Sequence, residues 1–282
     1  MRFRADRLAT LYFFHPLRQC VACHRSPRIP ILMYHSVSES SPNGAHPYFE
    51  TTTSPRVFAA QMKFLRENSY RALKLNEAAT YVESGEPLFE PSVVLTFDDG
   101  FQDFATNAFP ILQKYGFTAT VFLPTGYIAD DRREFNKRDC LSWTEVRELH
   151  RLGVTFGSHT VTHSQLTFLK VTEVEQELRR SKQTIEDQLG HPVDSFSYPF
   201  AFPETDRPFK RRLKDLLAAE GYRHGVTTII GTSGSGDHQF FLPRLPANSW
   251  DDLHLFRAKL EGGYDWLHPF QYATKLATFG VL

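Results

Sequence analysis

Two adjacent carboxylates, Asp98 and Asp99, follow an apolar run at residues 93–97 and precede Gly100. A run of β-branched and apolar residues that stops at a glycine is typical of a buried strand ending in a turn. Neighbouring side chains on a regular strand point to opposite faces, but a turn at Gly100 can bring both carboxylates toward one site. The pair can supply a metal ligand and a general base, although Asp-Gly also marks ordinary turns with an N-cap aspartate.

His159 and His163 follow a second apolar run, at residues 154–156. Two imidazoles at this spacing can meet on one side of a helical turn and share a metal ion, although such pairs are also common as ordinary surface residues. Two imidazoles and one carboxylate leave coordination positions open to water, which is typical of a catalytic rather than a structural metal site. The second aspartate would then be free to act as a general base.

The elements that must position these motifs alternate between apolar runs and amphipathic segments. We expect strands at residues 31–34, 93–97, 117–123, 154–156, 196–199, 226–230 and 242–245. About seven strand–helix units without a Gly-rich phosphate loop favour an α/β protein with a parallel β/α barrel, in which chemistry occurs at the C-terminal strand ends. Residues 231–236, which are rich in glycine, are expected to form one flexible loop.

Several helix starts carry capping signals. Ser54 precedes a first-turn proline, which predicts an N-cap at Ser54. Ser142 with Glu145, and Thr172 with Glu175, have the spacing of capping boxes and predict two further helix starts.

The bulk composition excludes some functions. Lys plus Arg and Asp plus Glu both number 32, and this balance argues against a general electrostatic interaction with nucleic acid or anionic lipid while allowing a local patch. The three cysteines are too few for a disulfide framework. Cys20 and Cys23, followed by His24, match the pattern of covalent haem attachment, but we favour a chance pair of thiols.

The N-terminal region resembles an incomplete export signal. Three arginines precede an apolar run at residues 8–14, but no clear small-residue cleavage site follows, and the run is far shorter than the ~20 residues that span a bilayer. We therefore expect no transmembrane segment and favour a cytoplasmic or membrane-associated protein. Residues 1–29 are expected to be an N-terminal extension and residues 30–282 the catalytic domain.

Residues 96–100 (TFDDG) and 158–163 (SHTVTH) resemble the first two signature motifs of the polysaccharide deacetylases, the NodB-like enzymes of carbohydrate esterase family 4. The resemblance extends from residues 32–37 (LMYHSV) to about Arg244, and it is closest to the branch of the poly-N-acetylglucosamine deacetylases. It implies a distorted (β/α)7 barrel, in keeping with the pattern of strands and helices.

The resemblance also implies a role for each matching residue. Asp98 matches the catalytic base, and Asp99, His159 and His163 match the metal ligands. Zinc is the default ion for this ligand set, and cobalt, nickel or iron would fit nearly as well. In the resembling branch the general acid comes from the M-Y-H segment, which nominates His35; a buried histidine bonded to backbone is the alternative.

A third motif departs from the family pattern. Residues 197–201 (SYPFA) stand where many relatives have R-x-P-x-G, so that Ser197 replaces the arginine and Ala201 the glycine. The resemblance implies that the backbone N–H of Phe200 helps to bind the oxyanion. The lost arginine would orient the base, and Arg244 could replace it from another strand end, unless it forms only a surface ion pair.

These roles predict a metal-dependent hydrolase that removes N-acetyl groups from an N-acetylhexosamine-containing polysaccharide or glycan, by means of a metal-activated water. Its partner would be an N-acetylated polysaccharide or oligosaccharide. The alternatives are an amidohydrolase for a small non-sugar amide and a non-catalytic carbohydrate-binding relict. Four aromatic residues in loops near the motifs could stack on sugar rings, although packing is the favoured role for each: Tyr48, Tyr127, Trp143 and Phe202.

Overall fold

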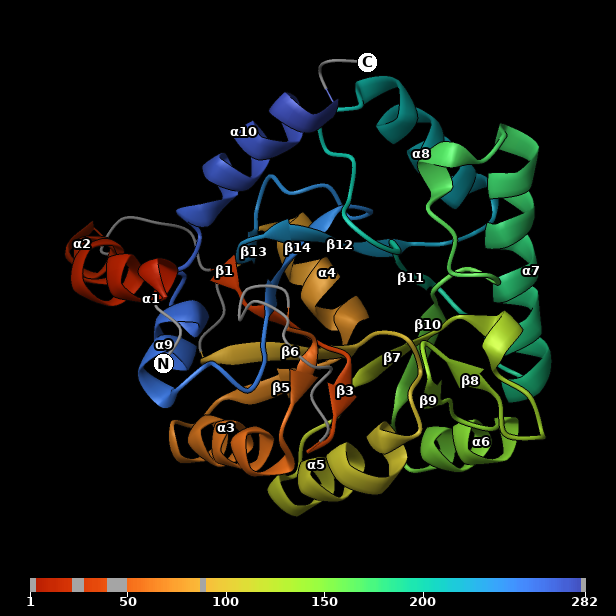
Figure 1. Ribbon diagram of the computed structural model, residues 1–282, viewed down its shortest axis with the longest axis horizontal. Coiled ribbons are helices and arrows are strands. Elements are labelled where there is room, and N and C mark those ends of the chain that lie inside the picture. Colours follow the sequence, from red (N-terminus) through yellow and green to blue (C-terminus); the bar gives the residue numbers. More distant parts are fainter. Residues whose placement is uncertain (1–3, 22–27, 40–49, 87–89, 280–282) are drawn as a thin grey trace.

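The centre of the molecule is a closed barrel of parallel strands with helices around it (Figure 1). The computed structural model describes residues 4–21, 28–39, 50–86 and 90–279. The barrel, which the pairing of β2 with β6 closes, has the order β2 (Ile31–Tyr34), β14 (Leu242–Pro246), β12 (His224–Ile230), β11 (Ser195–Ser197), β10 (Thr155–Ser158), β7 (Thr120–Leu123) and β6 (Ser92–Phe97). The predicted fold class, an α/β protein with a distorted (β/α)7 barrel, is confirmed.

An additional strand, β5 (Arg71–Leu73), distorts the barrel. It pairs with the first half of β6, whereas β7 pairs with the second half from Thr96 onward. Both lie on the side of β6 opposite β2, because Val94 pairs with Leu73 of β5 and also with Ile31 of β2. Strand β5 therefore separates β6 from β7 at the N-terminal end of the barrel. The apolar periodicity did not predict this short strand.

Helices cover the outside of the barrel (Figure 1). They are α3 (Pro55–Glu67), α5 (Phe109–Tyr115), α6 (Trp143–Arg151), α7 (Val171–Leu189), α8 (Arg207–Ala219), α9 (Leu253–Leu260) and α10 (Leu267–Phe279). Helix α4 (Leu75–Ser84) instead lies at the centre of the ring in the view of Figure 1, and its buried side chains belong to one apolar cluster with residues of β6, β7, β12 and β14. The N-terminal helices are α1 (Ala5–Ala9), the π-helical turn η1 (Thr10–Phe14) and α2 (His15–Val21). Short elements complete the chain: β1 (Arg28–Ile29), β3 (Ser36–Val37), β4 (Thr52–Thr53), η3 (Phe104–Ala108), η4 (Thr125–Tyr127), β8 (Glu134–Phe135), β9 (Arg138–Asp139), η5 (Leu166–Phe168) and β13 (Ser233–Gly234).

Two predicted helix starts are confirmed. The Ser54 side chain accepts a hydrogen bond from the Val57 N–H at 3.3 Å at the start of α3. Ser142 and Glu145 form the expected capping box of α6, with the Ser142 N–H donating to the Glu145 carboxylate at 2.7 Å and the Glu145 N–H donating to Ser142 Oγ at 3.3 Å. Each satisfies backbone donors that have no partner within the helix.

The predicted capping box of Thr172 and Glu175 is wrong. Helix α7 begins at Val171, so Thr172 already lies in its first turn. Glu173 instead accepts a hydrogen bond from the Lys170 N–H at 2.7 Å. Glu173 lies three residues after Lys170, the residue that precedes the helix, and this is the spacing of a capping box. The capping carboxylate is therefore that of Glu173 and not that of Glu175.

The expectation of one flexible loop at residues 231–236 is also wrong. Strand β13, inside this stretch, pairs antiparallel with β1. Arg28 of β1 donates to the carbonyl and hydroxyl oxygens of Thr232, and Asp265 accepts from the Thr232 N–H at 2.9 Å. Partners distant in sequence therefore order a segment whose composition is typical of a loop.

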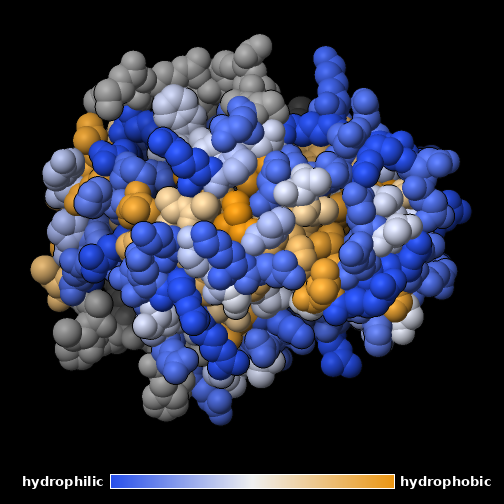
Figure 2. Space-filling model, turned by 90° about the horizontal axis from the view of Figure 1, so that it is seen from below, coloured by the Kyte–Doolittle hydropathy of each residue, from blue (hydrophilic) through white to orange (hydrophobic). Residues whose placement is uncertain are grey.

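The surface over α3, α5 and α6 is mostly hydrophilic, with a band of hydrophobic atoms across its middle (Figure 2). Their buried side chains, such as Phe58, Met62, Leu112 and Val146, pack against the barrel. Among the residues that the structure describes, no helix is both long enough and apolar enough to cross a bilayer.

Candidate metal centre and active site

Asp98 and Asp99 leave β6 in a left-handed turn. The φ angles of Asp99 and Gly100 are 69° and 59°, a region that non-glycine residues rarely adopt. A Cβ atom on Gly100 would lie 2.8 Å from Leu123 Cδ2, so a larger residue would force a shift. Both carboxyl groups are buried and both act electrostatically on His159. The left-handed turn therefore brings the adjacent side chains to one site.

His159 and His163 meet through a loop, and the expected helical turn is wrong. Residues 159–163 are not helical, and Thr160 and His163 have φ angles of 67° and 54°. Thr160 Oγ1 accepts from the His163 N–H at 3.0 Å, and Glu177 of α7 accepts from two further N–H groups of the loop at 2.8 and 2.9 Å. These bonds hold the two ring centroids 4.7 Å apart.

Asp99, His159 and His163 form a compact set of metal-type donors. Asp99 Oδ1 lies 3.6 Å from His159 Nε2 and 3.3 Å from His163 Nε2. One donor atom from each residue lies within 4.8 Å of the others, a geometry found for no other group of His, Cys, Asp or Glu in the described part of the chain. Asp99 Oδ1 is buried yet makes no hydrogen bond among the described residues. A buried oxygen without a donor, facing two imidazole nitrogens, fits a divalent cation.

The orientation of His159 also fits metal ligation. Its Nδ1 lies 2.7 Å from the carbonyl oxygen of Ser197, at the end of β11. A proton on Nδ1 donated to this carbonyl leaves the Nε2 lone pair directed toward Asp99.

Asp98 is bound by Arg244 of β14, a strand that only β2 separates from β6 in the barrel. The Arg244 Nη1 and Nη2 atoms donate to the two carboxylate oxygens of Asp98 at 2.8 and 2.7 Å. The remaining N–H groups of the fully buried guanidinium donate to the Thr227 carbonyl, Thr96 Oγ1 and Ser197 Oγ. Every N–H of the guanidinium thus has an acceptor. The alternative of a surface ion pair is wrong.

Ser197 contacts both Asp98 and Arg244, although the sequence pattern marked it only as the position where an arginine is missing. Its hydroxyl donates to Asp98 Oδ1 at 3.2 Å and accepts from Arg244 Nη2 at 3.1 Å. Its carbonyl oxygen accepts from His159. No clear signal marked it, because the predicted strand ran over residues 196–199, whereas β11 ends at Ser197.

The charges of the site explain its pKa shifts. Burial raises the pKa of Asp98, but the charge and hydrogen bonds of Arg244 outweigh it and lower this pKa to about 2. Burial also opposes ionisation of Asp99, whose pKa is nevertheless lowered by His159 and His163. For His159, burial lowers the pKa and the two carboxylates raise it by more. Both aspartates are therefore ionised at neutral pH.

His35 follows β2 and lies beside the same charges. Burial lowers its pKa below the ordinary value of histidine, against the opposing charges of Asp99 and Asp98. Its ring makes no hydrogen bond with the residues that the structure describes. Within this part of the chain, His35 is therefore not the backbone-bonded histidine of the alternative interpretation. Its ring nitrogens are available to a ligand.

Aromatic rings enclose His163. Phe135, on β8, and Phe200 have ring centroids 4.9 and 4.7 Å from that of His163. Phe200 has a φ of 59° and is 52% exposed, and its N–H makes no hydrogen bond with the described residues. Phe135 was not singled out in the sequence, because it lies on a short hairpin far from each motif.

Most of the predicted stacking residues are packed or lie outside the described part of the chain. Trp143 is 5% exposed and Phe202 is fully buried, so neither can stack on a sugar. The half-buried Tyr127 packs on Phe135, with ring centroids 4.5 Å apart. Tyr48 lies outside the described residues, as does Cys23 of the haem-attachment pattern.

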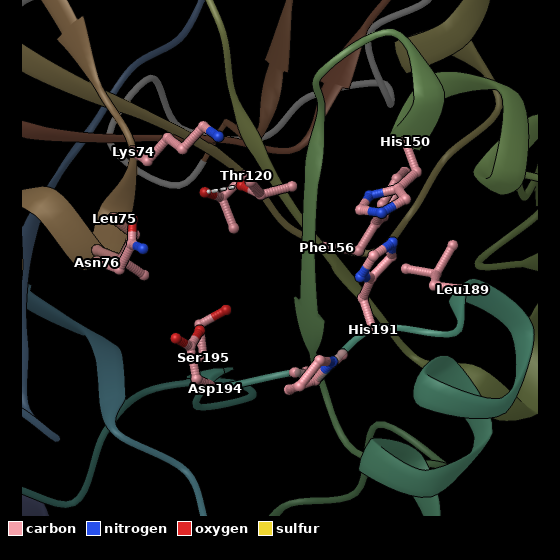
Figure 3. A pocket seen from close by; sticks show the side chains of 13 residues that line it. Lys74, Leu75, Asn76, Thr120, His150, Phe156, Leu189, His191, Asp194 and Ser195 are labelled. Atoms are coloured by element: carbon pink, nitrogen blue, oxygen red, sulfur yellow. Dashed lines mark hydrogen bonds between the residues drawn. The ribbon is translucent and has the colours of Figure 1, made fainter.

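A cavity of about 180 Å³ lies at the other end of the barrel (Figure 3). Thr120, Thr155 and Ser195, at the N-terminal ends of their strands, line it together with the rings of His150 and His191. The Thr120 and Thr155 hydroxyls bond to each other at 2.7 Å. Active sites of β/α barrels lie at the C-terminal strand ends, and this cavity does not include the donors of the site described above.

The carboxylates and imidazoles thus meet at the C-terminal strand ends of a (β/α)7 barrel, where the active sites of β/α-barrel enzymes lie. Residues 86–223 match the family model of the polysaccharide deacetylases. These residues therefore form a polysaccharide deacetylase domain, and they include Asp98, Asp99, His159, His163 and Ser197.

Known relatives agree with this assignment. YxkH of Bacillus subtilis, named as a polysaccharide deacetylase, is 28% identical over 86% of this chain and 79% of its own length. The poly-β-1,6-N-acetyl-D-glucosamine N-deacetylase of Staphylococcus aureus is 23% identical over 72% of this chain and 73% of its own. The solved structure of the Streptococcus pyogenes deacetylase PplD, in complex with acetate, covers 84% of this chain and 99% of its own at 26% identity, with a TM-score of 0.73.

Proposed function

We propose that this chain removes N-acetyl groups from an N-acetylhexosamine-containing polysaccharide or oligosaccharide. The observation that carries the proposal is the juxtaposition of two units: the donors of Asp99, His159 and His163, and the Asp98–Arg244 pair. The name of the Staphylococcus aureus relative supports an N-acetylglucosamine polymer as the substrate class.

Asp99, His159 and His163 would hold a divalent ion, with zinc favoured and cobalt, nickel or iron as alternatives. When bound, the ion would supply Lewis-acid chemistry, which polarises an acetamide carbonyl and makes a water more acidic. The carbonyl of Ser197 keeps His159 in the tautomer that ligation requires.

Asp98 acts as the general base. Arg244 keeps its carboxylate ionised and fixes its orientation through two hydrogen bonds, at 2.8 and 2.7 Å. The carboxylate can then accept a proton from a water that attacks the acetamide carbon. Arg244 is a positioning residue, because its N–H groups are all directed at protein acceptors.

Phe200 and His35 would act on the reacting amide. The unbonded N–H of Phe200 is available to donate to the developing oxyanion. His35, close to both carboxylates, would protonate the departing amine, without which an amide has a poor leaving group.

The test is release of acetate and free amine from a panel of N-acetylated glucosamine oligomers of increasing length. The comparison is between wild type, Asp98→Asn and Asp99→Asn, each with its metal content measured. We expect Asp98→Asn to retain metal and lose activity by about a hundredfold or more, because general-base catalysis contributes at least this factor. Asp99→Asn should lose both metal and activity.

Three results would contradict the proposal. Full activity of Asp98→Asn would show that Asp98 is not the general base, and full metal content of Asp99→Asn would show that Asp99 is not a metal ligand. Hydrolysis of small acetamides without any activity on oligomers would show that the reaction is amide hydrolysis but that the substrate is a small amide and not a glycan.

A further inference from the structure

The short strand β3, which directly follows His35, is paired with another strand on one edge only. The N–H groups of Ser36 and Ser38 donate to carbonyl oxygens in and beside β4, at 3.4 and 3.0 Å. Successive residues of a strand direct their backbone groups to opposite edges, so the N–H and carbonyl of Val37 lie on the other edge. Among the described strands none pairs with that edge. Val37 is fully buried, and its backbone groups therefore need partners other than a strand.

Side chains at the start of η3 supply these partners. Asp103 Oδ1 accepts from the Val37 N–H at 3.1 Å, and Asn107 Nδ2 donates to the Val37 carbonyl oxygen at 2.8 Å. The second oxygen of Asp103 accepts from the hydroxyl of Ser36. The Asp103 carboxylate thus binds both residues that follow His35.

Arg138 of β9 completes this cluster. Its guanidinium lies 3.7 Å from Asp103 Oδ2, and it donates to the hydroxyl oxygen of Ser36. In the hairpin of β8 and β9, Arg138 pairs with Phe135, whose ring packs on that of His163. Asp103 is therefore held at the same end of the barrel as the candidate metal ligands, although it belongs to none of the units described above.

The contacts of Asp103 connect the base to the proposed acid. Asp98 and Asp103 belong to one run of chain after β6, and the Asp98 N–H donates to the carbonyl oxygen of Tyr34 at 3.0 Å. His35 thus lies between Tyr34 and Ser36, which are both bonded to this run. Because the ring of His35 makes no hydrogen bond with the described residues, its place depends on the backbone at either side.

We propose that Asp103 positions His35 for proton transfer to the departing amine. The inference rests on the proposed function, in which His35 is the general acid. Proton transfer requires the donor within hydrogen-bond reach of the leaving atom, and a displacement of about 1 Å can cost a hundredfold in rate. Loss of the Asp103 carboxylate frees one edge of β3 beside His35, while the printed contacts of Asp98 with Arg244 remain.

The test uses two substrates that differ in their leaving groups. The amine of an N-acetylglucosamine oligomer must be protonated as it departs, whereas the p-nitrophenolate of p-nitrophenyl acetate departs without a proton. Values of kcat on both substrates are compared for wild type, His35→Ala, Asp103→Ala and the double variant. Metal content and thermal unfolding are measured for each protein, and the ester rate of Asp98→Asn is subtracted as background.

Asp265→Ala is the matched control. Asp265, like Asp103, accepts from one backbone N–H and one hydroxyl, those of Thr232 at 2.9 and 2.7 Å. It also lies beside arginines, with Arg18 Nη1 at 3.2 Å. Its contacts are with the segment around β13 and with the N-terminal helices, and not with the residues next to His35.

We expect Asp103→Ala to lower kcat on the oligomer about tenfold or more, with the ester rate within about twofold of wild type and unchanged metal content. His35→Ala should show the same difference between the substrates with a larger loss. The double variant should be no slower than His35→Ala, because both changes act on one proton transfer. Asp265→Ala should affect both substrates equally.

Equal losses of Asp103→Ala on the two substrates, losses that multiply in the double variant, or loss of metal would overturn the inference and leave the proposed function standing. Absence of oligomer hydrolysis by the wild type would overturn both. Should the alanine variant not fold, Asp103→Asn is judged by the same criteria, since it keeps the volume of the side chain and removes the charge beside Arg138.

Discussion

Ser197 contacts both halves of the candidate site. Its hydroxyl lies between Asp98 and Arg244, and its carbonyl oxygen orients His159. The carbonyl contact needs no particular side chain, but the hydroxyl contact does. Substitution of Ser197 can therefore remove the hydroxyl contact and leave the carbonyl contact in place.

Replacing Ser197 with alanine is expected to lower kcat about threefold to tenfold with KM unchanged, because one hydrogen bond to the base, worth ~1 kcal/mol, is lost. Metal content should stay at the wild-type level, since the carbonyl remains. Ser233→Ala, which removes a buried serine bonded to the Pro243 carbonyl, is the control for a general effect of the change. Steady-state kinetics check the prediction, and a rise in KM alone would contradict it.

Arg244→Gln is expected to raise the pKa of Asp98, because burial, which raises this pKa, is then no longer outweighed by the guanidinium. The lowered pKa of the wild type contributes stability that is present above the unfolded value near 3.9 and is lost as the pH falls through about 2. In the variant this contribution disappears, and unfolding should become easier by roughly 3 kcal/mol at neutral pH. The acid limb of the pH–rate profile should move to higher pH. Denaturant unfolding and pH–rate profiles measure both, and an unmoved acid limb would show that Arg244 does not control the base.

At the scale of elements, helix α7 holds the loop that carries the two histidines. The Glu177 carboxylate of α7 accepts two backbone N–H groups of this loop at 2.8 and 2.9 Å. The left-handed conformations of Thr160 and His163 are unfavourable for side-chain-bearing residues and depend on such contacts.

Glu177→Ala is expected to weaken metal affinity about tenfold, because the loop loses charge-assisted hydrogen bonds that hold His163 near Asp99. Glu186→Ala is the matched control. It lies on the same helix and accepts the Val193 N–H at 2.8 Å, in a segment that carries none of the three candidate metal ligands. Metal titration distinguishes them, and equal losses in the two variants would contradict the role of Glu177.

Sequence patterns predicted the barrel because each strand is a buried apolar run, and a run such as 93–97 is visible without its partners. They also indicated the strand-end positions of Asp98 and His159, whereas Arg244, predicted at a strand end, lies in the middle of β14. They did not predict β5, α4, α9, α10 or the position of Phe135, whose places depend on contacts distant in sequence. The conformation of residues 159–163 was missed for the same reason, since Glu177 stabilises it from another helix.

At the scale of the whole molecule, the N-terminal segment, residues 5–20 of α1, η1 and α2, is joined to the rest of the chain by carboxylates. Burial raises the pKa values of Asp6, Asp252 and Glu261, but arginine and other hydrogen-bond partners lower all three below their ordinary values. The placement of the domain boundary at residue 29 remains a prediction, because packing of α1 and α2 does not decide which part folds alone.

The contact of this segment should weaken in acid. Carboxylates with lowered pKa values stabilise the contact above their unfolded pKa values near 4, and this contribution is lost as the pH falls through the lower folded values. Hydrogen exchange, expressed as protection relative to intrinsic rates, should show residues 5–20 losing protection below about pH 4 while α7 keeps it. Protection of the segment that persists as long as that of α7 would contradict this expectation.

Arg244 has a further consequence for how such a site can change over generations. In the motif that residues 197–201 resemble, an arginine stands where this chain has Ser197. An arginine at position 197 would place a like charge beside Arg244, which already bonds both oxygens of Asp98, and a chain with neither arginine would bury Asp98 without a counter-charge. Descent from one arrangement to the other therefore passes through an unfit intermediate, unless both positions change together. We therefore expect the residues at positions 197 and 244 to change together during evolution or not at all.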